Sequence, residues 1–419
     1  MRVRRKNIEE LKPGDYVCRL DRPWAETPLP YRGFEFSGEE DLETLRTYCR
    51  HVWISVQREQ GTDEARVPGT GKKDVEAEPE AQIQPDTTDS EPEVSAKTPP
   101  DFRKGARQVK AARKIVADAC AAVLNQSRDG QLPDPGKVQP AVNQMQQALE
   151  QFPHAGLWLL SLRDHGDALV DHSVNVAALS MMLGRRLRNE AGQPLMSESE
   201  IVGLGLAGLF HDLGKTMLPR RLVYKKGPES QDDWDRIHNH PYHGSLILRR
   251  GGAPDHIVYT VRHHQERIDG TGFPDGLQGR DIKLPWRIVG LSNAYDSMTS
   301  SWPRFPAISG HQALRRLARE PEQSWGRKLV QHFTQMMGVY PPGTPVILDN
   351  GTEGIVVESG PHSKLQPVVA VRKQGKRPGH IQLALVDLSV EGNEREIDTV
   401  TAPDAEHRRM IQVVTRTAA

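Results

Sequence analysis

The sequence lacks several features that mark particular classes of protein. It holds only three cysteines, Cys18, Cys49 and Cys120, which are widely spaced and form no CxxC pair. An odd and scattered set predicts reduced thiols rather than a disulfide framework. No apolar run approaches the roughly 20 residues that cross a bilayer, and the first residues lack the apolar stretch of a signal peptide. We therefore expect a cytoplasmic protein without membrane insertion.

The chain also lacks a net charge. Lys and Arg total 55, and Asp and Glu total 55, so the formal charge is zero. Bulk charge therefore offers no reason to expect a polymeric nucleic acid as partner. The length of 419 residues exceeds what one compact core usually organises, which predicts two or three domains.

Two segments precede the main body of the chain. Residues 1–57 read as a small β-rich module, with strands expected at Tyr16–Leu20 and Val52–Ile54 and a short helix over Glu39–Arg50. Residues 58–103 hold almost no large apolar side chain and are rich in Glu, Asp, Pro and Thr. Such a composition cannot bury enough surface to offset chain entropy, so we predict an acidic, disordered linker.

The rest of the chain predicts a helical domain and a closing β segment. Over residues 104–337 apolar residues recur at helical spacing, with Val109, Ala112, Val116, Cys120 and Val123 forming one stripe. Residues 338–419 begin with a hairpin pattern, in which Asp349-Asn350-Gly351 separates two apolar runs. We therefore expect a mainly α fold, a helical bundle flanked by a small β-rich N-terminal module and a short C-terminal β segment.

One adjacent histidine and aspartate in the bundle could serve a metal site. His211 and Asp212 fall on a predicted helix that we extend over Glu200–Gly214. An aspartate has two oxygens and can bridge two cations, which phosphodiester-cleaving sites hold about 3.5–4 Å apart. Lys215 follows three residues later on the same helical face and could offer a cation to a phosphate oxygen.

A second histidine pair lies downstream. His263 and His264 are expected at a helix end, before the glycine-rich run Asp269–Pro274, whose glycines let backbone approach a bulky ligand. Adding His172, His240 and Asp296 gives nitrogen and oxygen ligands without a thiolate, a set that suits divalent Fe, Mn or Zn. A lone histidine on an apolar face is more often packed than ligating, so the order of these motifs carries the interpretation.

In that order the motifs resemble the HD-GYP family, a branch of the HD phosphohydrolases. The resemblance runs from His165 to Ser301 and rests on these segments: DHSVNVAAL at 171–179, LFHDLGK at 209–215, HNHPYHG at 238–244, HHQERIDGTGFPDGL at 263–277 and RIVGLSNAYDSMTS at 287–300. Residues 11–34 are similar to an uncharacterised domain often fused ahead of HD-GYP domains, and the closing β segment resembles a common tail of the family.

The resemblance implies roles for particular residues. The first metal would be held by His172, His211, Asp212 and Asp296, and the second by Asp212, His240, His263 and His264. Lys215 would contact the scissile phosphate and, with Asp212, carry catalysis. Substrate contacts would come from Lys215, Asp269, Gly270, Gly272, Phe273 and Arg304. The cofactors would be two divalent ions, Fe or Mn first, with Zn, Ni, Co and Mg as alternatives.

The chain departs from the family pattern at several positions. The signature HHE reads His263-His264-Gln265, and GYP reads Gly272-Phe273-Pro274. Some members carry a glutamate that supports a third metal where this chain has Ala168, so we expect a two-metal site. The family's DRPYR run reads Ser301–Phe305, and Arg304 is the candidate for its phosphate-contacting arginine.

The activity implied is hydrolysis of cyclic di-GMP to pGpG, with GMP as a further product, by hydroxide activated between two metals in bacterial signalling. The alternatives are a weak or inactive domain that binds cyclic di-GMP or a partner protein, and an HD enzyme for another nucleotide. Candidate partners are signalling proteins of the diguanylate cyclase type and a second copy of the chain.

Overall fold

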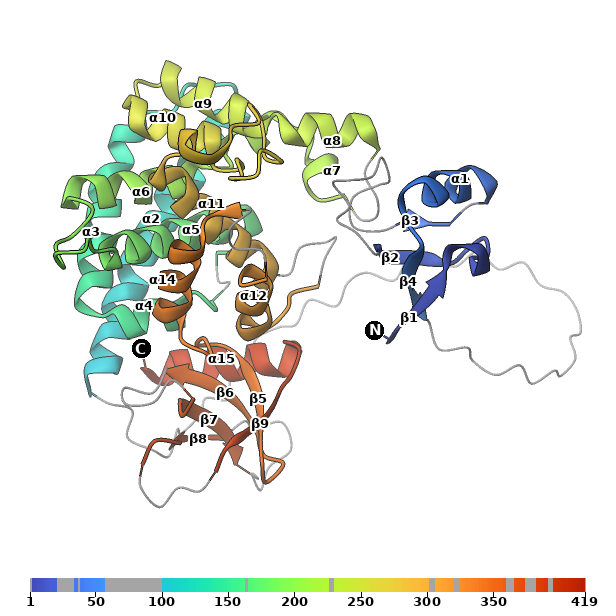
Figure 1. Ribbon diagram of the computed structural model, residues 1–419. Coiled ribbons are helices and arrows are strands. Elements are labelled where there is room, and N and C mark those ends of the chain that lie inside the picture. Colours follow the sequence, from blue (N-terminus) through green and yellow to red (C-terminus); the bar gives the residue numbers. More distant parts are fainter. Residues whose placement is uncertain are drawn as a thin grey trace, which may run out of the picture. The chain divides into compact units, whose positions relative to one another are not determined.

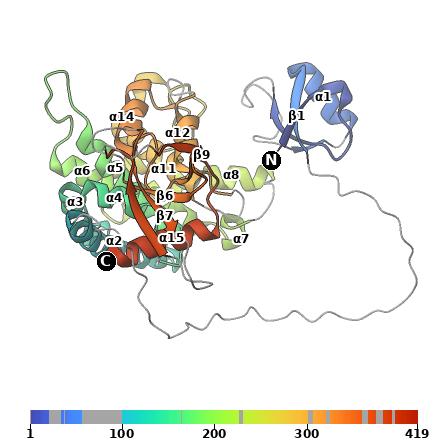
Figure 2. The same ribbon diagram turned by 90° about the horizontal axis from the view of Figure 1, so that it is seen from below.

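The computed structural model describes residues 2–20, 34–36, 38–56, 100–162, 165–225, 230–300, 306–319, 324–358, 365–373, 382–390 and 395–418. The chain divides into two compact units, Met1–Thr88 and Asp89–Ala419, which are drawn in Figures 1 and 2 and described separately. The predicted linker, 58–103, lies mostly outside the described residues, and the helix that follows it begins at Pro100.

The first unit is a small antiparallel sheet with one helix. Its elements are β1 (Arg2–Asn7), η1 (Ile8–Glu10), β2 (Tyr16–Leu20), β3 (Phe34–Glu35), α1 (Glu39–Tyr48) and β4 (His51–Val56). The strand order is β1-β4-β2-β3. Both predicted strands and the predicted helix are confirmed, although the helix ends at Tyr48 because Cys49 is extended. β1, which pairs with β4, was not anticipated.

The second unit is mainly helical. Its helices are α2 (Pro100–Arg128), η3 (Pro135–Val138), α3 (Gln139–Gln151), α4 (Pro153–Leu159), α5 (Ala168–Arg186), α6 (Glu198–Phe210), η4 (Leu213–Met217), α7 (Arg220–Val223), α8 (Gln231–His238), α9 (His240–Arg250), α10 (Asp255–His263), η5 (Gly279–Asp281), α11 (Leu284–Thr299), α12 (Gly310–Leu317), α14 (Arg327–Met337) and α15 (Ala405–Ala418). The predicted mainly α class is confirmed. None of the helices in the described ranges is long and apolar enough to cross a membrane.

The predicted apolar stripe on α2 is buried from Val109 to Val123, and Cys120 within it is a free, buried thiol. Cys49 of the first unit is also buried. Helices α5 and α6 pack closely against each other. A Cβ added at Gly208 would lie 2.8 Å from Cα of Ala177, so only glycine permits this approach. The packing brings the C-terminal end of α6 beside the N-terminal half of α5.

The predicted helix over Glu200–Gly214 is wrong at its end. The α-helix stops at Phe210, His211 caps it, and Asp212 has φ −99° and ψ 8°, outside the α conformation. The chain leaves the helix because η4 packs on α9, where a Cβ at Gly214 would lie 1.9 Å from the carbonyl oxygen of His240. His211 and Asp212 therefore lie at a helix junction. Their side chains are not held about 100° apart, as those of adjacent residues within an α-helix are.

A five-stranded antiparallel sheet closes the chain. Its strands, β5 (Pro345–Leu348), β6 (Glu353–Glu358), β7 (Val368–Lys373), β8 (Gln382–Asp387) and β9 (Ile397–Val400), follow the order β8-β7-β6-β5-β9. The predicted β5–β6 hairpin and the strand at Val368 are confirmed. The final helix, α15, was not anticipated; it runs across the sheet in Figure 1, and Trp158 of α4 bonds its Thr415. One face of the sheet joins the hydrophobic core of the helices.

Candidate metal centre

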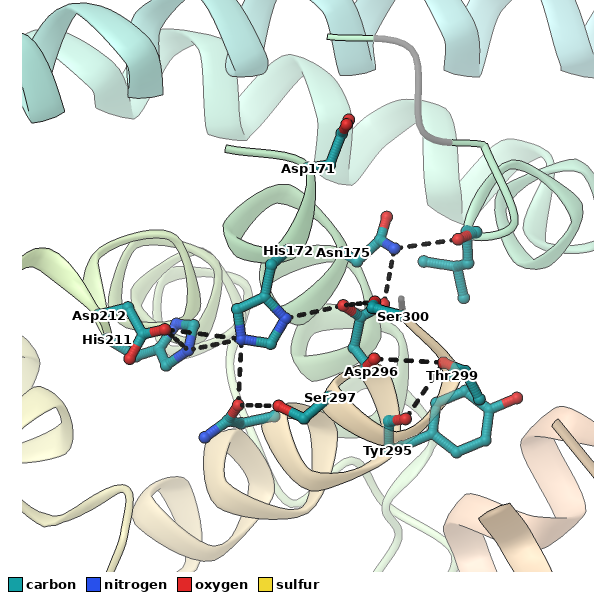
Figure 3. Close-up of polar contacts among 12 residues, drawn as sticks. Asp171, His172, Asn175, His211, Asp212, Tyr295, Asp296, Ser297, Thr299 and Ser300 are labelled. Carbon is teal, nitrogen blue, oxygen red and sulfur yellow. Dashed lines mark hydrogen bonds and ion pairs between the residues drawn. The ribbon is translucent and has the colours of Figure 1, made fainter. Parts of the chain in front are cut away.

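Three buried side chains converge where α5, the end of α6 and η4 meet. His172 comes from α5, and His211 and Asp212 come from the junction before η4 (Figure 3). Nε2 of His172 lies 3.1 Å from Nε2 of His211 and 3.7 Å from Oδ2 of Asp212, while Nε2 of His211 lies 3.4 Å from that same oxygen. Donors about 3.0–3.7 Å apart can share one cation with bonds of about 2.1 Å.

A second group of potential ligands shares Asp212. Nε2 of His240, the first residue of α9, lies 3.1 Å from Oδ1 of Asp212 and 3.4 Å from Nε2 of His264, which caps α10. Oδ1 of Asp212 is buried and lacks a hydrogen-bond partner within the described chain. Asp212 therefore points one oxygen at each group, as the bridging role implied by the family resemblance requires.

Hydrogen bonds fix which nitrogen each imidazole presents. Nδ1 of His211, His240 and His264 bonds the main-chain oxygen of Gly208, Ile237 and Val261, respectively, at 2.6–2.7 Å. A carbonyl oxygen can only accept, so each Nδ1 carries the proton, and a neutral ring then presents a lone pair at Nε2. Nδ1 of His172 similarly donates to the carboxylate of Asp296 at 2.7 Å.

These lone pairs face one another without a proton between them. Burial lowers the pKa of His172, His240 and His264, which keeps these rings neutral. Two nitrogen lone pairs at 3.1 Å, or at 3.4 Å, repel unless a cation lies between them. The donors therefore fit divalent metal ions, because nitrogen and oxygen atoms converge on two places and each imidazole is oriented by a hydrogen bond on its far side.

Asp212 remains a carboxylate despite its burial. Burial alone raises the pKa of its carboxyl, but the polar surroundings of the carboxylate, with the ammonium charge of Lys215 beside it, outweigh that effect and hold the pKa well below its usual range. Nζ of Lys215 lies 2.6 Å from Oδ2 of Asp212. The Lys215 side chain is 22% exposed, whereas Asp212 is buried, so the lysine lies between the centre and solvent.

Two predicted ligands lie outside these groups. Asp296 of α11 contacts Nδ1 of His172, on the side of the ring away from His211 and Asp212. His263 points elsewhere, with Nδ1 3.3 Å from Oδ2 of Asp275 and its ring against Trp286. His263, Glu266 and Asp275 form a third group of potential ligands. The roles predicted for Asp296 and His263 as direct ligands stay predictions.

The glycine-rich loop folds back beside the second group. Both oxygens of buried Glu266 accept main-chain N–H groups, from Asp275 at 2.8 Å and Leu277 at 3.0 Å. Four of the six predicted substrate residues lie on this loop. Asp269 is exposed and accepts two hydrogen bonds from Thr271, Gly270 has φ 81°, and Gly272 packs on the main chain of 265–267. The ring of Phe273 stacks on that of His238 at 3.9 Å and lies 6.2 Å from that of His240. Arg304, and the run Ser301–Phe305, lie outside the described residues.

Sequence reasoning missed four polar residues that serve the centre. Asn175 and Ser300 bond Asp296, Asn293 lies beside His172, and Glu266 holds the loop. A signal existed for two of them. Asn175 and Asn293 are polar residues within apolar helices, each three positions from a predicted ligand, and buried polar groups require partners.

Comparison with known proteins agrees with this geometry. The model of the HD domain matches residues 161–329. The chain carries an HD domain. A second model, of a domain of unknown function named DUF3391, matches residues 4–138, in front of the HD domain and overlapping α2. The predicted HD-type domain preceded by this uncharacterised domain is confirmed.

Three relatives illustrate the range of similar proteins. A cyclic di-GMP phosphodiesterase of Pseudomonas aeruginosa is 29% identical over 401 residues, covering 94% of this chain and 91% of that protein. A 3'3'-cGAMP-specific phosphodiesterase of Vibrio cholerae is 28% identical over 149 residues, 36% of this chain and 33% of its own length. A solved HD-GYP-type protein of Bdellovibrio bacteriovorus matches 80% of this chain and 99% of its own, at 15% identity and a TM-score of 0.46.

Proposed function

We propose that the chain is a metal-dependent cyclic di-GMP phosphodiesterase of the HD-GYP branch. The observation that carries the proposal is the pair of ligand groups that share buried Asp212. In each group, two imidazoles present their Nε2 lone pairs toward a common point. The similarity to the Pseudomonas aeruginosa enzyme over nearly the whole of both chains supports cyclic di-GMP as substrate.

The residues of the centre would divide the work of phosphodiester hydrolysis. His172, His211, His240 and His264 would hold two divalent cations, Fe or Mn first among them, with Asp212 between. Bound cations of this kind supply an activated water nucleophile and neutralise phosphate charge.

Lys215 would add a positive charge where the substrate phosphate enters, because its ammonium lies at the exposed side of Asp212. Phe273, beside His240, would offer a ring face to a guanine base. Attack of water on one phosphorus breaks its bond to a ribose 3' oxygen, so the ring opens to linear pGpG. A second hydrolysis would yield GMP.

The test is hydrolysis by protein purified without oxygen and loaded with Mn²⁺ or Fe²⁺. We expect conversion of cyclic di-GMP to pGpG that stops on chelation and falls by at least a hundredfold in Asp212→Asn. Asp232→Asn is the matched control, because Asp232 is an exposed residue of α8 paired with Arg236.

Nucleotide binding without metal-dependent turnover would contradict the proposal and favour the binding-module alternative. A strong preference for 3'3'-cGAMP would keep the reaction class and change the substrate, in line with the Vibrio cholerae relative.

A further inference from the structure

His172 is contacted by a different α11 residue at each of its ring nitrogens. Nδ1 lies 2.7 Å from Oδ2 of Asp296, and Nε2 lies 3.1 Å from Oδ1 of Asn293. The two α11 residues are three positions apart, so they stand one helical turn from each other on the same face. Only the Nε2 side also faces His211 and Asp212.

The carboxylate of Asp296 is engaged on both oxygens. Oδ2 accepts the Nδ1 proton of His172 and the hydroxyl proton of Ser300 at 2.9 Å, and Oδ1 accepts from the amide of Asn175 at 2.7 Å (Figure 3). The imidazole ring separates these oxygens from a cation on Nε2. This is the arrangement in which a carboxylate orients a ligating histidine and raises its basicity.

A buried residue from α2 supports the same arrangement. Arg113, 5% exposed, donates to Oδ1 of Asn175 at 2.5 Å and to the main-chain oxygen of Leu162 at 3.3 Å. Asn175 therefore has its amide oxygen held by Arg113 while its amide nitrogen holds Asp296. These hydrogen bonds run in series from Arg113 through Asn175 and Asp296 to His172, and they hold the imidazole ring on its Nδ1 side.

Asn293 contacts Nε2 of His172, the ring nitrogen that Asp296 does not contact. Its side chain is buried, and Oδ1 also accepts a bond from the Ser297 hydroxyl at 3.1 Å, which orients that oxygen toward His172. Because Nε2 of His172 presents a lone pair, it donates no hydrogen bond to the amide oxygen of Asn293, which lies 3.1 Å away. An amide oxygen is, however, a suitable hard donor to a divalent cation.

We infer that Asn293 Oδ1 is the α11 ligand of the first cation, and that Asp296 is a positioning residue acting through His172. The inference rests on the metal centre of the proposed function. It makes the first set neutral except for the shared Asp212, so two cations would be balanced by one carboxylate. Such a centre keeps a positive charge for an anionic phosphodiester.

The test measures metal binding to the full-length apoprotein without nucleotide. Calorimetric titration with Mn²⁺ gives stoichiometry and affinity, and the visible spectrum of the Co²⁺ form reports the donor set. We expect Asn293→Asp to bind one equivalent at least tenfold more tightly with an altered Co²⁺ spectrum, and Asn293→Ala to bind it at least tenfold more weakly. Asn189→Asp, an exposed position, is the matched control.

Asp296→Asn separates the two assignments. As a positioning residue it should weaken one equivalent roughly 10- to 100-fold while leaving the Co²⁺ spectrum close to wild type. Loss of one equivalent in Asp296→Asn, together with wild-type binding and an unchanged spectrum in both Asn293 variants, would overturn the inference. Failure of the wild-type apoprotein to bind Mn²⁺ or Co²⁺ would instead refute the metal centre itself.

Discussion

At the residue scale, the chemistry depends on which atom each side chain presents. The imidazoles of His211, His240 and His264 were predicted as ligands from their motifs, but only the main-chain acceptors of their Nδ1 protons determine that Nε2 faces inward. Lys215 shows the same dependence, because its 2.6 Å contact with Asp212 both lowers the pKa of that carboxyl and places a cation at the exposed side of the centre.

Replacing Lys215 by methionine should separate these two effects. We expect Lys215→Met to retain two equivalents of metal near neutral pH, because the substitution leaves every proposed ligand in place, and to lose about 10²- to 10³-fold in turnover of cyclic di-GMP. Steady-state kinetics on metal-loaded protein, with elemental analysis of the same samples, measures both. Lys225→Met, at a lysine paired with Asp233, is the control. Unchanged turnover in Lys215→Met would remove the lysine from the mechanism.

At the scale of elements, close backbone contacts align the ligands. Glycines at 208, 214 and 290 let α6 approach α5, η4 approach α9 and α11 approach the main chain of His264, respectively. The positions matter because the ligands come from four helices and two junctions, and a shift of one element by an ångström separates donors that must share a cation.

The Gly214→Ala substitution tests this arrangement. An added methyl would lie 1.9 Å from the oxygen of His240 and 2.6 Å from the nitrogen of Gly244, both main-chain atoms that cannot yield cheaply. We expect a stability loss of about 1–3 kcal/mol and loss of the metal held by His240 and His264. Thermal unfolding and elemental analysis measure these changes, with Met217→Ala, 60% exposed on η4, as control. A stable variant with two equivalents would show that η4 and α9 need not pack this closely.

At the scale of the whole molecule, the chain has two units with separate hydrophobic clusters. The cluster of the first unit centres on Val17, Leu45 and Val52, and that of the second runs through the helices into one face of the C-terminal sheet. All the predicted ligands belong to the second unit. Metal binding should therefore stabilise one unit and not the other.

Calorimetric unfolding of the full chain should show this difference. With free metal at a hundred times its dissociation constant, the second unit should gain about 2.7 kcal/mol for each occupied site, and a chelator should remove that gain while the transition of the first unit stays in place. Asp212→Asn should abolish the shift. Movement of both transitions together would mean that the two units unfold as one.

Local patterns in the sequence were sufficient for much of this protein. Helical periodicity predicted the α2 stripe and turn chemistry predicted the β5–β6 hairpin, because these depend on neighbours within a few residues. The residues around Asp212 were instead predicted from the order of the histidine and aspartate motifs and their resemblance to a known family. The end of α6 and the helix α15 were not predictable in this way. Both depend on packing between segments far apart in the chain, as at Gly214 with His240 and at Trp158 with Thr415.

The same distinction holds within the centre. Composition and order determined which residue types gather there, whereas the tertiary structure decided which side of His172 each α11 residue occupies. Asp296 and Asn293 are both polar residues one turn apart, and sequence favours the charged one as ligand. The rotation of α11 against α5 places the carboxylate at Nδ1 and the amide oxygen at Nε2, because a helix presents residues three apart to different atoms of the ring it faces.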